Sequence, residues 1–468
     1  MVFSSLFFTF AFLPITLILY YTLGKRLRNI VLLVVSLIFY AWGEPVYILL
    51  MCASIIVNYF LGILLGKAAT ARGRTLFFIF SLLFNVGCLA YFKYAGMLIK
   101  TVEALSGVHL LAAAPALPLG ISFYTFHILS YVIDVYRGKI RPQKSLVLFA
   151  LYISMFPQLV AGPIVKYADI EAQLTDRSIT FQKFHSGMNR FLCGLAKKVL
   201  LANTIGLLWS EVKALPGAEL SVLMAWIGIV AFTLQIYFDF SGYSDMAIGL
   251  GKMLGFRFKE NFRYPYISQS VSEFWRRWHI SLGSWFRDYV YIPLGGNRAG
   301  TRRTILNLFV VWFLTGLWHG ASWNFVFWGL YFGVLIMLEK VFLEKQLKRW
   351  PQAVRHIYLL LCVVIGWVFF DFPNLGDALR FLGTMFGLGG AVFINAQTIA
   401  KLEAYSLLLF ICVIAATPWP KILGLSLRNK VYRASYKTGV VVYYCVLMFF
   451  STAYLVGSTF NPFIYFRF

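Results

Sequence analysis

The chain has few charged residues, and acidic ones are the scarcest. Of its 468 residues, 18 are Asp or Glu and 42 are Lys or Arg, so 13% are charged and the formal net charge is +24. Soluble globular chains have about 25% charged residues. The hydrophobic fraction here is 60%, and 18% of the residues are aromatic. This balance excludes an ordinary water-soluble domain and indicates a membrane protein.

Several motifs of common enzymes and metal sites are also missing. The six cysteines show no CxxC spacing, so the sequence predicts neither a zinc site nor a disulfide framework. The patterns HExxH, GxSxG and the P-loop are absent, which leaves metalloprotease, α/β-hydrolase and nucleotide triphosphatase functions without support. We therefore expect no metal ligands and no permanently bound cofactor.

Long apolar runs dominate the chain instead. A membrane-spanning helix needs about 20 apolar residues, and about ten or eleven windows of this kind occur. The first, residues 2–23, lacks a basic leader and an A-x-A cleavage site, so we expect a retained helix. The predicted fold class is an all-α polytopic membrane protein. Further spans are expected near 27–42, 46–66, 76–96, 357–370, 404–417 and 439–456.

Basic residues fall in alternate loops of the N-terminal third. The basic loops contain Lys25, Arg26, Arg28, Lys67, Arg72, Arg74, Arg137, Lys139, Arg141 and Lys144. The loops between them hold Glu44 in one case, and Lys100 with Glu103 in the other. This positive-inside pattern predicts that the N-terminus lies outside and the basic loops lie in the cytoplasm. The positive charge then faces the inner leaflet, and nucleic acid is not needed as a partner.

The middle of the chain departs from plain spanning helices. Pro and Gly interrupt residues 118–127 and 156–164, and such backbone is tolerated at membrane depth only inside protein or beside a cavity. The section 252–303 is basic and is expected at the inner leaflet, where re-entrant or interfacial helices fit. Ser270 and Glu273 have capping-box spacing. The stripe that follows has helical period and predicts one amphipathic helix with its aromatic side inward. It consists of Val271, Trp275, Trp278, Leu282 and Trp285.

His319 is the residue that most strongly indicates function. It lies between two apolar runs at a break that contains Gly320 and Ser322, with Trp318 and Asn324 nearby. An ionisable side chain at membrane depth is costly and is usually functional. Burial also disfavours the imidazolium ion, and neutral imidazole is the form that a general base needs. The alternative is a structural hydrogen bond to a neighbouring helix.

Other polar residues leave both alternatives open. His279 follows Trp278 at the edge of the apolar stripe, where it is either functional or an interfacial anchor. His127, on an apolar segment, is expected to be a packing residue. Asp239 and Asp245 close another apolar run, where they orient a substrate or bond to Lys or Arg of the adjacent basic section. A structural network is favoured for these two.

Five segments together resemble the membrane-bound O-acyltransferase (MBOAT) family, in its alginate O-acetylation (AlgI-like) branch, which is related to peptidoglycan O-acetyltransferases. They are FWRRWHISL at 274–282, YIPLGGN at 291–297, GLWHGA at 316–321, FDFSGYSD at 238–245 and STFNPFIYFRF at 458–468. The resemblance covers essentially the whole chain. It implies a ring of tilted helices around a central tunnel that reaches the catalytic histidine.

The resemblance also implies the site and the reaction. His319 would be the essential histidine and His279 the second. Substrate-binding or supporting roles would fall to Trp275, Arg276, Arg277, Trp278, Asp239, Tyr243, Asp245, Trp318 and Asn324. The donor would be cytosolic acetyl-CoA, bound from the basic side because Arg and Lys suit phosphates. The acetyl group would cross the inner (cytoplasmic) membrane of a bacterium to an extracytoplasmic acetyltransferase and then to an exopolysaccharide or cell-wall glycan.

The expected organisation is a single membrane domain over residues 1–468. Within it we expect an N-terminal helical bundle at 1–117, a catalytic core at 118–343 and C-terminal helices at 344–468. Two other functions fit the same features. One is D-alanyl transfer from a carrier protein to teichoic acid, and the other is a transporter or flippase. Whether His319 acts as a base or carries the acyl group is also open.

Overall fold

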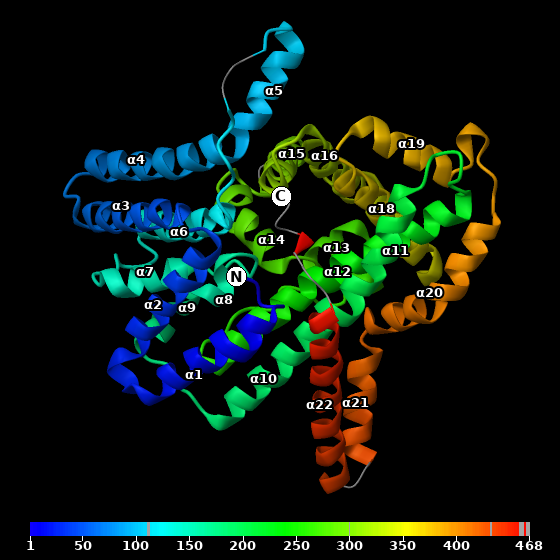
Figure 1. The fold of residues 1–468 in the computed structure, drawn as a ribbon. Coiled ribbons are helices and arrows are strands. Elements are labelled where there is room, and N and C mark those ends of the chain that lie inside the picture. The colour runs from blue at the N-terminus through cyan, green and yellow to red at the C-terminus, as the bar shows by residue number, and fades with distance from the viewer. Residues whose placement is uncertain (110–112, 299, 431–432, 458–462, 465–468) are drawn as a thin grey trace. The chain divides into compact units, whose positions relative to one another are not determined.

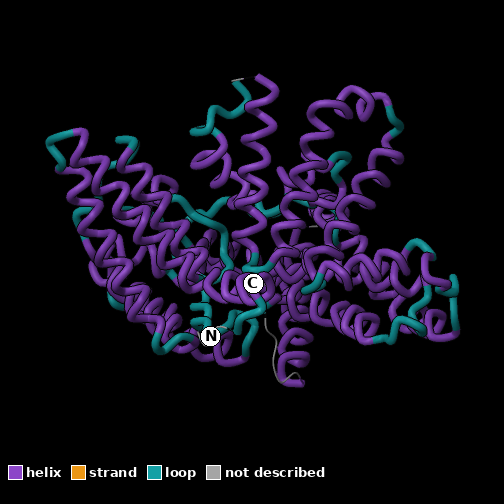
Figure 2. The backbone as a smooth tube through the Cα atoms, turned by 90° about the horizontal axis from the view of Figure 1, so that it is seen from above, coloured by secondary structure: helices purple, strands orange, loops and turns teal. Residues whose placement is uncertain are grey.

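The described residues form helices joined by loops, with no strand among them (Figure 2). The computed structural model describes residues 1–109, 113–298, 300–430, 433–457 and 463–464. In this part of the chain nine helical segments are long and apolar enough to cross a membrane. The prediction of an all-α polytopic membrane protein is confirmed.

The number of long spans is lower than expected. Apolar windows predicted about ten or eleven, whereas the described residues provide nine. The first apolar run contains only the shorter helical segment Phe8–Thr22. In the middle of the chain, α6 (Ile121–Tyr136) and α7 (Leu146–Ser154) stop at 16 and 9 residues. The Pro and Gly residues that precede and follow these helices account for their short length.

The backbone forms two compact units, which are described separately. The first comprises Met1–Phe191 with Met246–Lys259, and the second comprises Leu192–Asp245 with Glu260–Phe468. Two long helices, α10 (Phe181–Ala196) and α12 (Val222–Met253), contribute residues to both. The division at 117 and 343 that we expected from the sequence stays a prediction.

The first unit is a helical bundle held by apolar packing and a buried amide cluster. In addition to α6 and α7, its helices are α1 (Leu13–Thr22), α2 (Gly24–Gly43), α3 (Tyr47–Lys67), α4 (Ala71–Leu89), α5 (Ala95–Ser106), α8 (Phe156–Leu159) and α9 (Tyr167–Thr175). α4 packs against α3 and α6 (Figure 1). Between α3 and α4, Asn58 Oδ1 accepts hydrogen bonds from Ser81 Oγ and Asn85 Nδ2, each at 2.7 Å. Such interhelical hydrogen bonds join membrane helices that have no hydrophobic driving force between them.

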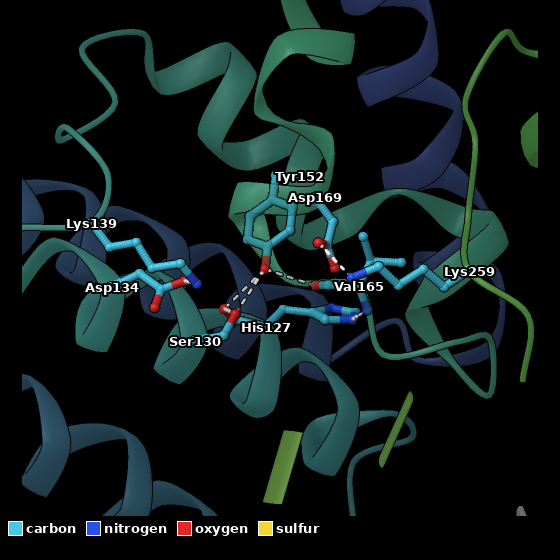
Figure 3. A network of polar contacts seen from close by, with 8 residues as sticks. All are labelled: His127, Ser130, Asp134, Lys139, Tyr152, Val165, Asp169 and Lys259. Carbon is cyan, nitrogen blue, oxygen red and sulfur yellow. Dashed lines mark hydrogen bonds and ion pairs between the residues drawn. The ribbon is translucent and has the colours of Figure 1, made fainter. Parts of the chain in front are cut away.

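The predicted break at 156–164 is present and buried. The chain after α8 is irregular until α9, and both backbone groups of Val165 are bound (Figure 3). Its N–H donates to His127 Nε2 (3.4 Å), and its carbonyl accepts from the Tyr152 hydroxyl (2.9 Å). His127 is fully buried. Its contact with the Val165 N–H meets a need of this segment, because irregular buried backbone requires such partners.

The second unit contains the hairpin that ends at His319. Its helices are α11 (Asn203–Ala214), α13 (Val271–Arg277), α14 (Ile280–Phe286), α15 (Gly300–His319), α16 (Trp323–Leu338), α17 (Glu344–Arg349), α18 (Gln352–Asp371), α19 (Leu375–Met385), α20 (Ala396–Ala415), α21 (Trp419–Lys430) and α22 (Arg433–Gly457). α15 and α16 lie side by side (Figure 1). They approach so closely that a Cβ atom on Gly316 would lie 2.5 Å from the Phe325 carbonyl oxygen. The predicted pair of helices around His319 is confirmed.

The single amphipathic helix predicted over 271–285 is wrong. The Ser270 hydroxyl accepts a hydrogen bond from the Glu273 N–H (3.0 Å), so α13 begins where the capping box predicted. However, α13 ends at Arg277, and α14 begins after His279, whose φ of 43° and ψ of 52° are left-handed. Only two described non-glycine residues have positive φ, and His279 is one of them. A left-handed residue cannot continue a right-handed helix, so the helix is interrupted at His279. The left-handed conformation costs a non-glycine residue roughly 1–2 kcal/mol.

Candidate active site

His279 is a buried imidazole in the turn between α13 and α14. Its exposed fraction is 2%, and it lies outside the nine candidate spans. The ring meets Phe240 edge to face at 4.6 Å between centroids, and Trp318 at 5.8 Å. Burial lowers the pKa of His279 to about 3, because desolvation disfavours the imidazolium. The side chain is therefore neutral near pH 7.

The amide of Asn261 determines which nitrogen of His279 carries the proton. Asn261 Oδ1 lies 3.2 Å from His279 Nδ1 and accepts the Ser281 backbone N–H at 3.2 Å. The Asn261 Nδ2 group donates to the Ser244 hydroxyl at 3.0 Å. Since a backbone N–H only donates, the atom facing His279 is the amide oxygen. Nδ1 must then hold the proton, which leaves the lone pair on Nε2.

His319 is a second buried imidazole at the last residue of α15. Its exposed fraction is 3%. Aromatic rings surround it, with centroid separations of 5.0 Å to Trp318, 4.8 Å to Trp328 and 5.6 Å to Phe370. Trp318 therefore contacts both histidines. The structure brings His319, Trp318 and His279 together from α15 and from the turn after α13.

A cavity of about 210 Å³ opens beside His279. It is lined by Trp275, Trp278, His279, Leu282, Gly283, Phe286, Arg287, Tyr291, Leu308, Val311, Trp312 and Thr315. His319 is not part of its lining. The walls are mostly apolar, and the polar side chains among them include the His279 imidazole, the Arg287 guanidinium and the hydroxyl-bearing Tyr291 and Thr315. Such a cavity suits a narrow, mainly apolar chain with a few hydrogen-bonding groups.

A second, polar cavity of about 660 Å³ shares three lining residues with the first, namely Tyr291, Leu308 and Trp312. Its charged lining consists of Glu273, Arg276, Glu339, Lys340, Glu344, Lys348 and Arg355. Each of the three carboxylates has a partner. Glu273 pairs with Arg277 (2.8 Å) and Glu344 with Lys348 (2.8 Å), while Glu339 accepts the Val271 and Ser272 backbone N–H groups at 2.6 and 2.8 Å.

The predicted residues of the FWRRWH segment have different surroundings. Trp275 lines the apolar cavity, and its ring also packs in a cluster with Trp312, Trp328 and Phe332. Trp278 lines the same cavity but packs mainly in the core, against Trp367 at 5.0 Å. Arg276 lines the polar cavity, whereas Arg277 is held in its ion pair with Glu273. Three of the four thus line cavities.

Asp239 and Asp245 form ion pairs with consecutive lysines. Asp239 pairs with Lys198, and its other oxygen accepts the Ile464 backbone N–H at 2.9 Å. Asp245 pairs with Lys197 at 2.7 Å. The partners lie in the π-helical segment Lys197–Ala202, not in the basic section 252–303 that we expected. Both lysines come directly after α10. They are brought next to the aspartates by the fold of the chain, which the spacing of residues in the sequence does not show.

Two further predicted residues have partners within the protein. Tyr243 packs against Phe463 with centroids 4.8 Å apart. Asn324 donates to the Phe372 carbonyl at 3.1 Å and to the Phe369 carbonyl at 3.4 Å, which satisfies acceptors at the end of α18. The chain ending that contributed to the resemblance, 458–468, lies outside the described residues except for 463 and 464.

Sequence reasoning missed Asn261 and Glu339. Asn261 is 18 residues before His279 in an irregular segment, and no periodic pattern connects the two. Glu339 lies 68 residues beyond the helix start that it caps. In the sequence, Glu339 is an acidic residue at the end of an apolar run, and this pattern alone does not indicate its partner. Among the described residues no group of His, Cys, Asp or Glu could hold a metal ion.

Two buried histidines that share Trp318, a mostly apolar cavity at one of them and a polar cavity beside it make up the candidate site. The model of the MBOAT, membrane-bound O-acyltransferase family matches residues 118–376, more than half of the chain. The chain belongs to this family and is an O-acyltransferase.

Its relatives place it in the alginate O-acetylation branch. A Pseudomonas putida protein named "Probable alginate O-acetylase AlgI" is 40% identical over the whole of both chains. A protein of the same name from Pseudomonas aeruginosa is 42% identical over 89% of this chain and 81% of its own. A peptidoglycan O-acetyltransferase from Helicobacter pylori is 32% identical over 83% of this chain and 80% of its own.

Proposed function

We propose that this enzyme moves an acetyl group from cytosolic acetyl-CoA, through a bacterial cytoplasmic membrane, to an extracytoplasmic acceptor that O-acetylates an exopolysaccharide or cell-wall glycan. The relatives at 40% and 32% identity are named as O-acetylating enzymes of alginate and of peptidoglycan. These names favour acetyl over D-alanyl as the group that is transferred. They also favour an enzyme over a transporter or flippase.

The two adjoining cavities support a donor that is anionic at one end and narrow at the other. In the polar cavity the carboxylates are committed to other partners, while Arg276 and Arg355 have no ion-pair partner among the described residues. These guanidinium groups fit the phosphates of CoA. The pantetheine arm would enter the apolar cavity and bring the thioester toward His279. The shared residues Tyr291, Leu308 and Trp312 join the two compartments.

We assign His279 to positioning the donor. Its Nε2 lone pair can accept an amide N–H of the pantetheine arm, while Asn261 holds Nδ1. A donor held in the correct orientation reacts faster, and small displacements of the donor reduce the reaction rate strongly. His279 is then a substrate-binding residue, and Asn261 acts through it.

We assign His319 as the general base. The acceptor hydroxyl attacks the thioester carbonyl carbon, so that a C–O bond forms and the C–S bond breaks. The hydroxyl proton passes to the imidazole and then to the departing CoA thiolate. Because α15 ends at His319, the negative end of the helix dipole stabilises the imidazolium formed during transfer. General base catalysis of this kind contributes on the order of 10²–10⁴-fold.

Turnover by purified protein tests the assignment. Wild type, His319→Ala, His279→Ala and the exposed-site control His185→Ala would be given radiolabelled acetyl-CoA and membranes that contain the acceptor. CoA thiol release and label on the acceptor would both be measured. We expect kcat to fall on the order of 10²-fold or more for His319→Ala, KM for acetyl-CoA to rise for His279→Ala, and no change for His185→Ala. Unchanged kcat in His319→Ala, with the fold intact, would disprove the assignment.

A further inference from the structure

A separate basic cavity in the first unit has no part in the proposed reaction. Its volume is about 770 Å³, and it lies where α1 meets α2 and where the chain enters α10. The charged side chains that line it are Lys25, Arg28, Asp176 and Arg177. No described carboxylate lies within ion-pair distance of the three cations. The cavity therefore has a surplus of positive charge available to a ligand.

Neutral groups hold Arg177 in place. Its Nε donates to the Tyr20 hydroxyl (2.9 Å) and the Leu254 carbonyl (3.2 Å). Its guanidinium carbon lies 4.5 Å from the centre of the Phe256 ring. Its Nη1 donates to the Gln173 and Leu174 carbonyls at 3.3 and 3.4 Å. The remaining nitrogen, Nη2, is buried and has no hydrogen-bond partner within the described chain. The side chain is thus fixed in position and keeps a charged donor group for an external acceptor.

Arg28 shows the same combination. Its guanidinium carbon lies 5.7 Å from the centre of the Tyr20 ring, on which Arg177 also packs at 5.6 Å. The buried Nε of Arg28 has no hydrogen-bond partner among the described residues. A buried donor without an acceptor is costly in a folded protein. Two guanidinium groups on one tyrosine ring, each with such a donor, are suited to an oxyanion with several acceptor oxygens.

The start of α10 adds a weaker contribution. Thr180 lines the cavity, and its Oγ1 accepts the Lys183 backbone N–H at 3.2 Å, which marks the helix start. The N-terminus of a helix favours anions. A phosphodiester has two charged oxygens and two ester oxygens in a tetrahedral arrangement, so it offers this set of donors acceptors in more directions than a planar carboxylate does.

The side chains around the basic cavity indicate whether its phosphate ligand is a lipid headgroup or a soluble phosphate. Lys25 and Arg28 lie near the start of α2, in a basic segment that the sequence predicts to face the cytoplasm. Apolar side chains nearby are exposed: Leu23 at 45%, Leu27 at 44% and Phe181 at 83%. Cationic and exposed apolar side chains together are typical of headgroup depth. We propose that this cavity binds the phosphate headgroup of an anionic phospholipid of the inner leaflet, with the acyl chains against these apolar residues.

Native mass spectrometry of the full-length protein in mild detergent tests the proposal. The probe is phosphatidylglycerol, and the apparent Kd of the first bound lipid is measured. The Lys25→Gln/Arg28→Gln double variant is expected to raise this Kd about tenfold, as the loss of two charge-assisted contacts implies. Arg177 is left intact because it connects α9 to Leu254 and its removal endangers the fold.

A charge-matched control distinguishes a site from general attraction. Lys67→Gln/Arg72→Gln removes two exposed cations from another basic loop and is expected to change the Kd less than about twofold. Phosphatidylcholine should bind wild type more weakly and be insensitive to either double variant. Equal losses in both double variants would overturn the proposal. Displacement of the lipid by inorganic phosphate at the same concentration would also overturn it, since the cavity would then take a soluble phosphate.

Discussion

At the residue scale, the reaction that we propose depends on two imidazoles that differ in their surroundings. His279 has an amide partner that fixes its tautomer, whereas aromatic rings and the end of a helix surround His319. One histidine is thus held in a defined orientation, and the other is placed where a positive charge is stabilised. These environments agree with a positioning role for His279 and a base role for His319.

Asn261→Ala separates orientation from mere packing. Without Oδ1 the proton of His279 is free to move to Nε2, and the lone pair that the donor needs is lost. We expect KM for acetyl-CoA to rise about tenfold, since one hydrogen bond to the donor worth on the order of 1 kcal/mol is lost, while kcat, which we assign to His319, stays near the wild-type value. Steady-state kinetics over a range of pH values measure both quantities.

Ser281→Ala is the matched control for Asn261→Ala. It removes a hydroxyl that donates to the same Oδ1 at 2.9 Å and lies 3.5 Å from His279 Nδ1, and it leaves the amide oxygen, which is nearer to Nδ1 at 3.2 Å, in place. KM for acetyl-CoA should then stay near the wild-type value. If both substitutions raise KM equally, the cluster only stabilises the turn, and the tautomer argument is wrong.

Sequence reasoning at this scale found residue types better than their partners. His319 stands out because an ionisable group at membrane depth is costly and rare, whereas His279 lies at the edge of the apolar stripe and is assigned a role by the family resemblance. Asn261 was missed because its amide meets His279 only after the chain turns, and the separation of 18 residues has no helical or strand period. For Asp239 and Asp245 the predicted cationic partners exist, but they come from a different segment than the one expected.

At the element scale, the break between α13 and α14 presents His279. The period of the apolar stripe predicted a continuous helix, because periodicity reports which side chains are buried and not the φ of a single residue. The aromatic residues are buried as predicted, with Trp278 and Trp285 exposed by 1% and 5%. The left-handed residue turns the imidazole out of the helical register toward the cavity. Non-glycine residues with such backbone persist mostly at functional sites.

Replacing His279 by Gly and by Ala separates backbone strain from loss of the imidazole. Both variants remove the same side-chain contacts, but Gly adopts positive φ without a steric penalty. His279→Gly should therefore be more stable than His279→Ala by about 1 kcal/mol, and both should show the raised KM for acetyl-CoA. Thermal unfolding in detergent gives the comparison. Equal unfolding temperatures would mean that the turn changes its backbone conformation when the imidazole is absent.

At the scale of the whole molecule, positive charge is distributed in sites with different tasks. The sequence predicts this charge in cytoplasmic loops, but it does not distinguish cations that pair with carboxylates from those left for ligands. Arg277 and Lys348 pair with carboxylates, whereas Arg276 and Arg355 line the polar cavity without an ion-pair partner in the described chain. The positions of the side chains separate the two groups of cations. Arg276 and Arg277 are adjacent in the sequence, yet only Arg277 pairs with a carboxylate and only Arg276 lines the polar cavity.

Replacing both arginines of the polar cavity tests whether these cations bind the donor. Arg276→Gln/Arg355→Gln should raise KM for acetyl-CoA about tenfold, since two contacts to phosphate are lost. It should leave kcat unchanged, because phosphates far from the thioester are bound equally in the ground and transition states. The matched control Lys345→Gln/Arg349→Gln removes two exposed cations of α17 that do not line the cavity. If the control raises KM as much, the charge of the whole face attracts the donor and the polar cavity does not bind it. A rise in KM confined to the first pair, and reduced at high salt, supports entry of acetyl-CoA through this cavity.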